Sequence, residues 1–184
     1  MNTDGASIRE SIEQVELRPA RVADAADMAA LLVAERSFMA PFDPPRGEEF
    51  YTVEGQRREF EQLELAALAG TRQRFLIRDA GTLVGWVSVT NVVRGPFRSA
   101  NLGYAVAQEA NGRGIATHAV GEVCDWAFGE AGLHRLEAGT LLDNHGSQRV
   151  LAKNGFERIG IARRYLLING DWRDHVLFQR VADG

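Results

Sequence analysis

The chain has 184 residues, of which 45% are hydrophobic and 25% are charged, and this composition is typical of a globular protein and unlike that of a disordered one. Its 21 Lys and Arg against 25 Asp and Glu give a formal charge of -4, which disfavours direct binding to nucleic acid or to an anionic membrane surface. The single cysteine, Cys124, excludes an internal disulfide framework and a multi-cysteine zinc site.

The sequence also lacks the marks of membrane insertion and of secretion. No apolar run approaches the roughly 20 residues that span a bilayer, and residues 1–13 lack the apolar centre of a signal peptide. We therefore expect a cytoplasmic protein in which Cys124 is a buried, reduced thiol. Residues 1–14 are predicted to form a flexible tail, and residues 15–184 one domain.

The first half of the chain predicts a strand, two helices and three further strands. The strand at residues 15–18 ends at Pro19, and Asp24 then caps a helix containing Met28, Leu31 and Leu32. After a proline-rich break, a second amphipathic helix ends at Gly70, with an apolar set of Phe60, Leu63, Leu65 and Leu68. The three following strands form an antiparallel meander at residues 74–78, 83–93 and 98–106.

The apolar pattern changes after this meander. Residues 111–114 open a helix that runs to Gly129, because the period changes from two to roughly 3.6 residues. A strand, a short helix and two strands around a turn at Asn169-Gly170 follow, at residues 134–140, 147–153, 156–167 and 176–180. Because no repeat or linker interrupts this order, the sequence predicts an α/β fold with a mixed sheet and helices on its faces.

The junction after the strand ending at Val106 has the features of an anion-binding loop. It reads Asn111-Gly112-Arg113-Gly114-Ile115-Ala116-Thr117. Glycines let backbone N–H groups approach a phosphate closely, and a helix N-terminus adds roughly half a positive charge. The loop is neither a Walker loop nor a dinucleotide fingerprint, and a pyrophosphate is the expected ligand. A turn that only starts the helix is the alternative.

A second informative segment, residues 144–156, lies one strand further along the chain. Together the two segments resemble the GNAT superfamily of acyl-CoA N-acyltransferases. The resemblance narrows to the RimJ/RimL branch, the ribosomal-protein alanine N-acetyltransferases, through residues 91–97, 102–104 and 165–176. It implies the GNAT fold, with a mostly antiparallel sheet splayed at the binding site of the cofactor acetyl-CoA. It also implies acetyl transfer to a protein N-terminal alanine or serine amine, by direct attack.

The resemblance implies roles for individual residues. The loop would bind the pyrophosphate of acetyl-CoA, and residues 144–156 would support its pantetheine arm. The implied cofactor-binding residues are Tyr104, Val106, Asn111, Gly112, Arg113, Gly114, Ile115, Ala116, Thr117, Asn144 and Lys153. Asn111 stands where the superfamily usually has Gln or Arg, so Arg113 and backbone amides would take over the phosphate contact. Backbone amides around Val106 would polarise the thioester carbonyl.

Ser147 is the implied catalytic residue. Its hydroxyl can donate a hydrogen bond to the departing thiolate of coenzyme A and help return its proton. Many superfamily members carry a tyrosine where this chain has Leu151, and its absence strengthens the role of Ser147. The alternative is that Asn144 and Ser147 cap the short helix, and both roles can coexist.

The sequence does not identify a general base or a metal site. A free N-terminal amine has a pKa of about 8 and can lose its proton through water, so no dedicated base is required. The candidates are Glu35, Glu109, Asp174 and His175. Related chains often carry a glutamate at the position of Ile159, and its role does not transfer to this chain.

Several residues outside these motifs have two interpretations. The aromatic residues Phe38, Phe42, Phe50 and Tyr51 either line an acceptor groove or close the core. Trp172 is interpreted as a structural plug in preference to a recognition residue. A solvated surface is preferred to ribosome contact for the arginine cluster of Arg72, Arg74 and Arg78.

Three questions of function stay open at this level. The acceptor is alternatively a small-molecule amine, such as an amino acid, a polyamine or an aminoglycoside. The protein is alternatively a catalytically silent acyl-CoA-binding sensor. The partner of the chain is a protein N-terminus in the preferred interpretation, and the oligomeric state, including a homodimer, is not determined.

Overall fold

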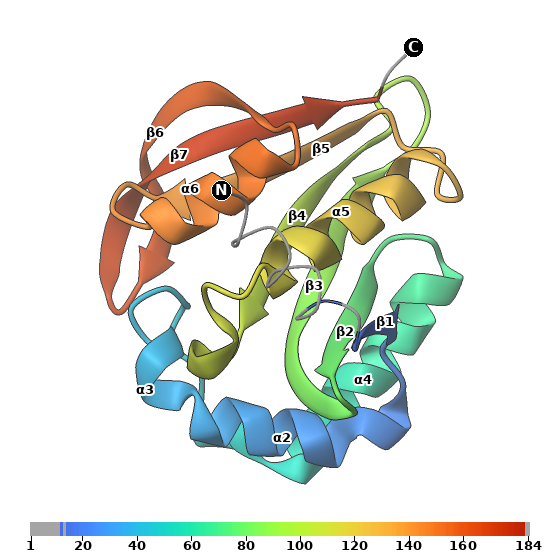
Figure 1. The fold of residues 1–184 in the computed structure, drawn as a ribbon, viewed down its shortest axis with the longest axis vertical. Helices are drawn as coiled ribbons and strands as arrows, with labels where there is room; N and C mark the ends of the chain where they lie inside the picture. Colours follow the sequence, from blue (N-terminus) through green and yellow to red (C-terminus); the bar gives the residue numbers. More distant parts are fainter. Residues whose placement is uncertain (1–11, 13, 183–184) are drawn as a thin grey trace, which may run out of the picture.

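A computed structural model describes residues 12 and 14–182 of the chain. In it, a seven-stranded sheet carries helices on its faces (Figure 1). Neighbouring strands are antiparallel except β4 and β5, and their order is β1-β2-β3-β4-β5-β7-β6. The predicted mixed and mostly antiparallel fold is therefore confirmed. The strands are β1 (Val15–Pro19), β2 (Gln73–Asp79), β3 (Thr82–Val93), β4 (Ser99–Val106), β5 (Arg135–Leu141), β6 (Glu157–Ile168) and β7 (Asp171–Val181).

The helices of the described chain cover both faces of this sheet. They are α2 (Ala25–Ala34), α3 (Arg36–Met39), α4 (Val53–Leu68), α5 (Ile115–Phe128) and α6 (His145–Lys153), with the 3-10 turns η1 (Val22–Asp24), η2 (Glu48–Tyr51) and η3 (Gln108–Ala110). In β2, the Phe75 ring packs against Trp126 of α5 with centroids 5.0 Å apart, whereas Arg74 lies near Glu59 of α4. Because side chains alternate along a strand, α5 and α4 lie on opposite faces.

The core forms as the apolar periods predict, with one exception in α4. The apolar stripe of α5 is buried, and within it burial raises the pKa of the Cys124 thiol to about 11. Phe60 and Leu63 of α4 are also buried, but Leu65 and Leu68 are 61% and 87% exposed. Those two residues lie on the other side of the helix, so only half of the predicted apolar set contacts the core.

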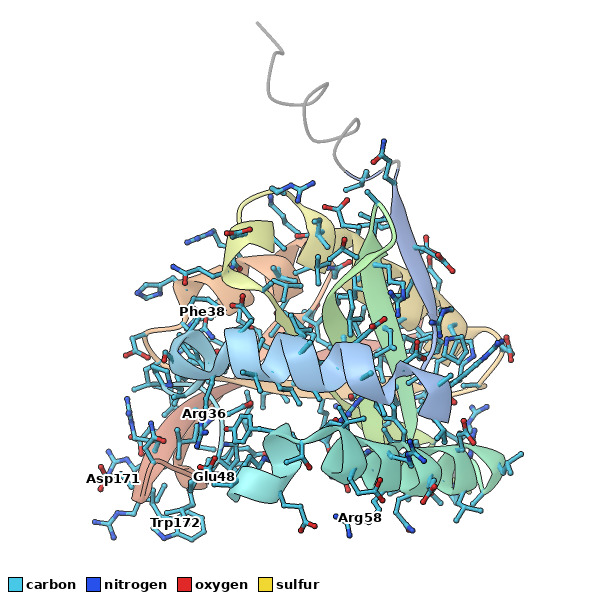
Figure 2. The ribbon with its side chains drawn as sticks, turned by 90° about the horizontal axis from the view of Figure 1, so that it is seen from below. Arg36, Phe38, Glu48, Arg58, Asp171 and Trp172 are labelled. Atoms are coloured by element: carbon cyan, nitrogen blue, oxygen red, sulfur yellow. The ribbon has the colours of Figure 1, made fainter. Side chains whose placement is uncertain are left out.

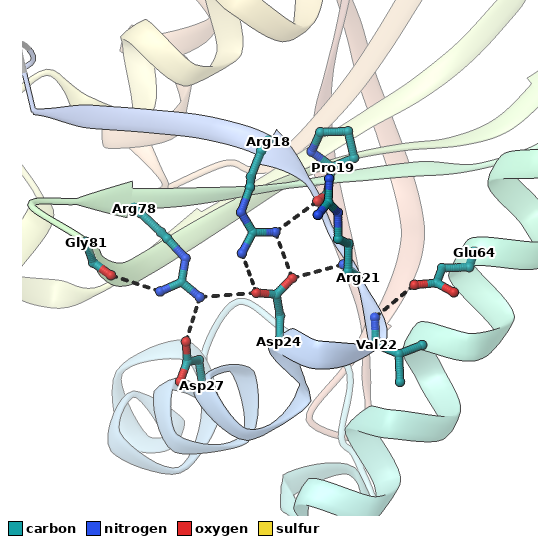
Figure 3. A network of polar contacts seen from close by, with 9 residues as sticks. All are labelled: Arg18, Pro19, Arg21, Val22, Asp24, Asp27, Glu64, Arg78 and Gly81. Atoms are coloured by element: carbon teal, nitrogen blue, oxygen red, sulfur yellow. Dashed lines mark hydrogen bonds and ion pairs between the residues drawn. The ribbon is translucent and has the colours of Figure 1, made fainter.

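Three further predictions differ from the structure. The last strand begins at Asp171 and not at residue 176, because residues 171–173 continue the ladder with β6 beyond the Asn169-Gly170 turn. Trp172 lies on this extended hairpin and is 60% exposed, so the plug interpretation is wrong. Asp24 occupies the N-cap position of α2 without capping it, because its carboxylate accepts hydrogen bonds from Arg18, Arg21 and Arg78 (Figure 3).

The predicted tail at residues 1–14 lies, apart from residues 12 and 14, outside the described residues. Within the described part of the chain, no helix has the length and apolar character needed to cross a membrane.

The parallel pair of β4 and β5 is the feature that creates the site. Residues 99–101 of β4 pair with residues 135–137 of β5, and the ladder between the two strands ends there. Residues 102–106 and 138–141 therefore diverge, and β5 continues its pairing with β7 on its other side. Such a gap leaves backbone polar groups inside the sheet available to a ligand. The predicted splay is confirmed.

Candidate functional site

A cavity of about 700 Å³ opens where β4 and β5 diverge. Tyr104 lines it from the face that α5 covers, because its row across the sheet continues through Val87 to Phe75. Gly103 and Ala105 also line it, and they belong to the opposite face. The cavity therefore passes through the sheet between the two strands. Its volume is in the usual range of small-molecule sites.

The end of the cavity on the α5 face is a loop built for an anion. Gly112 and Gly114 have φ values of 77° and 84°, a left-handed conformation that favours glycine. Gly114 is the N-cap of α5 and has no side chain to cap it. The N–H groups that begin α5, at Ile115, Ala116 and Thr117, have no carbonyl of a preceding turn to bond, and all three residues line the cavity. This geometry favours a phosphate-like ligand.

The two side chains expected to assist this loop point elsewhere. The Asn111 amide donates to the carbonyl oxygens of Ala107 and Gln108, both at 3.2 Å. Arg113 forms an ion pair with Asp79 of β2, with Nη1 2.7 Å from Oδ2. Among the predicted site residues, Arg113 is the one that does not line the cavity. Backbone amides are therefore the main anion donors that this loop presents.

Tyr104 of β4 and Ser147 of α6 both line the cavity and contact each other. The phenolic oxygen of Tyr104 lies 2.7 Å from Ser147 Oγ and 3.0 Å from the Ser147 carbonyl oxygen. Burial raises the pKa of Tyr104 to about 12, although the hydrogen bond with Ser147 opposes this shift. The phenol therefore stays protonated at neutral pH.

The helix-capping alternative holds for Asn144 and not for the Ser147 hydroxyl. Asn144 Oδ1 accepts a hydrogen bond from the backbone N–H of Ser147 at 3.0 Å and so caps α6. The Ser147 hydroxyl is bonded to Tyr104 instead. Capping thus fixes the backbone of Ser147, a residue that lines the cavity, and leaves its hydroxyl to Tyr104.

This hydroxyl pair can supply a proton to an anion in the cavity. A phenol has one proton, which Tyr104 can donate either to the Ser147 carbonyl or to Ser147 Oγ. In the second arrangement the Ser147 proton is free to point into the cavity. The change between the two arrangements needs only rotation of two O–H bonds.

Of the four candidate bases, His175 is the one that lines the cavity. It is buried, and its Nδ1 lies 3.1 Å from the Arg173 carbonyl oxygen. Glu35 accepts the backbone N–H of Gln108 at 2.8 Å, and Asp174 accepts that of Arg164 at 2.8 Å. Glu109 is exposed. In the described chain, no group of His, Cys, Asp and Glu side chains could hold a metal ion.

The end of the cavity on the α4 face contains residues that the sequence patterns did not single out as site residues. Phe38 and Phe42 line it, so the groove interpretation applies to this pair. Phe50 and Tyr51 pack against the core, as the other interpretation expected. Arg36 of α3 lies over the Tyr51 ring and points toward Glu48 of η2, so this ion pair joins α3 to η2 (Figure 2). The other lining residues here include Asp43, Arg72, Arg74, Trp86, Ser88 and Thr90.

Arg74 and Thr140 line the cavity, although the sequence patterns did not assign either to the site. The Arg74 side chain is 11% exposed, so the solvated-surface interpretation is wrong for this residue. Strand alternation and the pairing of Arg74 with Ser88 across β2 and β3 are the signals that would have placed it at the site. Thr140 of β5 lines the cavity with a buried hydroxyl that has no hydrogen-bond partner among the described residues. A buried unpaired hydroxyl is costly, and this one is placed to bond a ligand.

A splayed mixed sheet with an anion-binding loop and a cavity through the sheet defines an acetyltransferase fold of the GNAT type. The chain belongs to the GNAT acetyltransferase family, because the model of the Acetyltransferase (GNAT) domain matches residues 14–157. The Bacillus subtilis protein named "Probable N-acetyltransferase YjcK" is 40% identical over 163 residues, which cover 88% of this chain and 90% of the relative. The ribosomal protein uS5-alanine N-acetyltransferase of Escherichia coli K12 is 30% identical over 172 residues, covering 92% and 89%.

Solved structures give the same assignment. The ribosomal-protein-S5-alanine acetyltransferase from Vibrio fischeri matches with a TM-score of 0.91 and 34% identity, over 93% of this chain and 94% of that chain. Mycobacterium smegmatis RimJ, solved in complex with CoA-disulfide, matches with a TM-score of 0.87 and 36% identity, over 91% and 82%. The chain is thus an N-acetyltransferase of the GNAT type with RimJ/RimL relatives, and the predicted family is confirmed.

Proposed function

We propose that this protein transfers the acetyl group of acetyl-CoA to the N-terminal amine of a protein, with the alanine or serine terminus of a ribosomal protein as the preferred acceptor. The observation that supports it best is the cavity through the sheet, since a donor and an acceptor can meet there from opposite faces. The relatives that act on the alanine of a ribosomal protein support the choice of acceptor.

The residues of this chain fit the proposed donor. The backbone amides that begin α5 would hold the pyrophosphate. The pantetheine arm would lie in the gap between β4 and β5, beside Val106, Asn144 and Lys153, and the unpaired Thr140 hydroxyl would bond one of its amides. When bound, acetyl-CoA supplies an activated thioester carbonyl.

Groups of this chain assist both the attack and the departure of the leaving group in the proposed transfer. The neutral amine attacks the thioester carbon, and backbone N–H groups on the open edge of β4 near Val106 polarise the carbonyl oxygen. As the carbon–sulfur bond breaks, Ser147 donates its hydroxyl proton to the leaving thiolate, while Tyr104 donates to Ser147 Oγ. The nitrogen loses its extra proton to water, and water returns a proton to Ser147, so the products are an N-acetyl amide and free coenzyme A and the hydroxyl pair is restored.

The experiment measures thiol release from acetyl-CoA with purified protein. The acceptors are short peptides that begin with Ala or Ser, the same peptides with blocked N-termini, free amino acids, polyamines and aminoglycosides. We expect turnover with the free peptides and none with the blocked ones. Turnover with small amines alone would show that the acceptor is a small molecule, while the acetyl transfer itself would stand. Tight acetyl-CoA binding with no turnover on any amine would favour a silent sensor.

A further inference from the structure

Arginine side chains outnumber carboxylates at the α4-face end of the cavity. Arg72 and Arg74 line this end, and Asp43 is the carboxylate that lines it with them. Glu59 of α4 approaches both arginines with one oxygen, which accepts from Arg72 Nη2 at 3.0 Å and lies 3.8 Å from Arg74 Nη2. A distance of 3.8 Å is too long for a hydrogen bond. Glu59 therefore neutralises the Arg74 guanidinium only in part.

Most of the hydrogen-bonding capacity of Arg74 is unused. A guanidinium has five N–H donors, and Arg74 uses Nε to donate to Ser88 Oγ at 3.0 Å. Its other N–H groups make no hydrogen bond with the described residues. Arg72, which lies beside Arg74, has a buried Nε that forms no hydrogen bond with the described residues. Because Arg74 lines the cavity, its unused N–H groups are available to an anionic ligand, and a charge-assisted bond to such a ligand would pair them.

The cations around Arg74 outnumber the acidic groups, because Arg46, Arg72 and Arg74 face Glu59 and Asp43. Burial raises the pKa of Asp43, against the opposing effect of Arg46 and Arg74. Burial lowers the pKa of Arg74 to about 10, with a further lowering by Arg72. Arg74 remains a cation at neutral pH, and the exposed Arg46 adds positive charge beside it.

The position of Arg74 fixes how far the anion would lie from the reacting amine. Arg74 pairs with Ser88, and Ser88 pairs with Gly103, so the three residues form one row across the sheet. Neighbouring strands are about 4.8 Å apart, and the guanidinium is drawn back to Ser88. It therefore lies about one strand spacing from β4, on the face of the sheet opposite to the Tyr104 side chain. That separation fits a carboxylate one residue away from the acceptor amine.

We propose that Arg74, supported by Arg72, binds a carboxylate of the acceptor, so that the enzyme selects peptides with an acidic side chain directly after the N-terminal residue. The choice of a peptide rests on the proposed function. The same positive charge repels the ammonium groups of polyamines and aminoglycosides, which disfavours them as acceptors.

The test compares kcat/KM for three peptides that differ only at position 2 and begin Ala-Glu, Ala-Gln and Ala-Lys. With the unmodified protein, we expect Glu to exceed Gln by about tenfold, because a guanidinium–carboxylate bond is charge-assisted, and Lys to be slowest. Arg74→Gln brings the Glu to Gln ratio close to one, and Arg74→Lys retains part of it. Equal rates for Glu and Gln, or a ratio that survives Arg74→Gln, would overturn the proposal.

The matched control is Arg58→Gln. Arg58 lies on the outer side of α4, away from the sheet, and pairs with Glu49 (Figure 2). This variant removes one positive charge and leaves the cavity unchanged, so the peptide ratio should stay at its original value.

A binding measurement separates this proposal from the proposed function. Calorimetry with coenzyme A present compares the N-acetylated products of the Glu and Gln peptides, which need no turnover. Tenfold tighter binding of the acidic product, lost in Arg74→Gln, supports the anion site even if the enzyme acetylates only small amines. Equal binding of the two products refutes the anion site, even if both peptides are acetylated.

Discussion

At the scale of single residues, the proposed transfer gives the Tyr104–Ser147 pair the task of returning a proton to the leaving group. The phenol is held protonated by burial, so it acts as a hydrogen-bond donor that turns the Ser147 proton toward the cavity. Leu151, where a tyrosine is common in the family, is fully buried and has no acidic group, so the proposal assigns this role to Ser147.

Replacement of Ser147 tests this role. We expect Ser147→Ala to lower kcat about tenfold or more, the lower end of the range for general acid catalysis, and to leave the affinity for acetyl-CoA nearly unchanged. Tyr104→Phe should cost less, because Ser147 keeps its own proton. Thiol release gives kcat, and calorimetry gives the affinity.

The control is Ser99→Ala, which removes another buried hydroxyl on the same strand as Tyr104 but outside the cavity. Its kcat should match that of the unmodified protein. If Ser147→Ala turns over at the original rate, Ser147 does not act as the acid. A loss of coenzyme A affinity equal to the loss of rate would instead make Ser147 a binding residue.

At the scale of elements, the loop before α5 depends on the backbone conformation of Gly114. Its φ of 84° strains any residue with a Cβ. We expect Gly114→Ala to destabilise the fold by about 1–2 kcal/mol and to raise the KM for acetyl-CoA about tenfold, because the first amides of α5 would turn away from the phosphate. Thermal unfolding and steady-state kinetics measure the two effects.

Gly132 provides the matched glycine. It follows α5, has a φ of 62°, and lies outside the cavity. Gly132→Ala should lose similar stability and keep the KM for acetyl-CoA. If the two variants show the same KM, the conformation of Gly114 does not matter for the donor.

The same scale shows which elements the sequence could predict. Strong local patterns suffice for α5, where an apolar period of 3.6 residues follows a glycine loop, and for the hairpin turn at Asn169-Gly170. They miss the start of β7 because residues 171–175 are polar or exposed for the most part, and only their pairing with β6 makes them a strand. Local patterns do not contain such long-range pairing.

The candidate site divides in the same way. The proposed donor side comes from two short segments, residues 104–117 and 144–153, so local motifs together with the family resemblance are enough to predict it. The acceptor side is assembled from β2, β3 and the segment after α3, and Arg74 joins it only through its pairing with Ser88. The family resemblance assigns Arg113 to the acetyl-CoA site, whereas in the structure Arg113 forms an ion pair with Asp79 of β2. That contact depends on the position of β2, which no local motif contains.

At the scale of the whole molecule, Asp24 links the first strand to the rest of the fold. Its carboxylate accepts from Arg18 of β1 at 2.9 Å and from Arg78 of β2 at 3.2 Å, while Asp24 itself precedes α2 (Figure 3). The hydrogen bond from Arg18 is the main cause that lowers the pKa of Asp24 from 3.8 to about 2, against the opposing effect of burial. A lowered pKa in the folded state means that the charged carboxylate stabilises the fold.

Asp24→Asn measures this stabilisation and its dependence on pH. The pKa shift corresponds to about 2 kcal/mol, which is fully present above pH 4 and is lost as the pH falls from about 4 through 2. At pH 7 we expect the variant to unfold roughly 4–8 °C lower than the unmodified protein. The difference should shrink as the pH falls from 4 toward 2, because Asp24 is protonated first in the unfolded chain, near its ordinary pKa, and in the folded protein only near pH 2. Asp27→Asn is the control, since Asp27 also binds Arg78 but is 54% exposed, and exposed pairs contribute about 1 kcal/mol or less. A difference for Asp24→Asn that does not change with pH would show that the network stabilises through packing and not through charge.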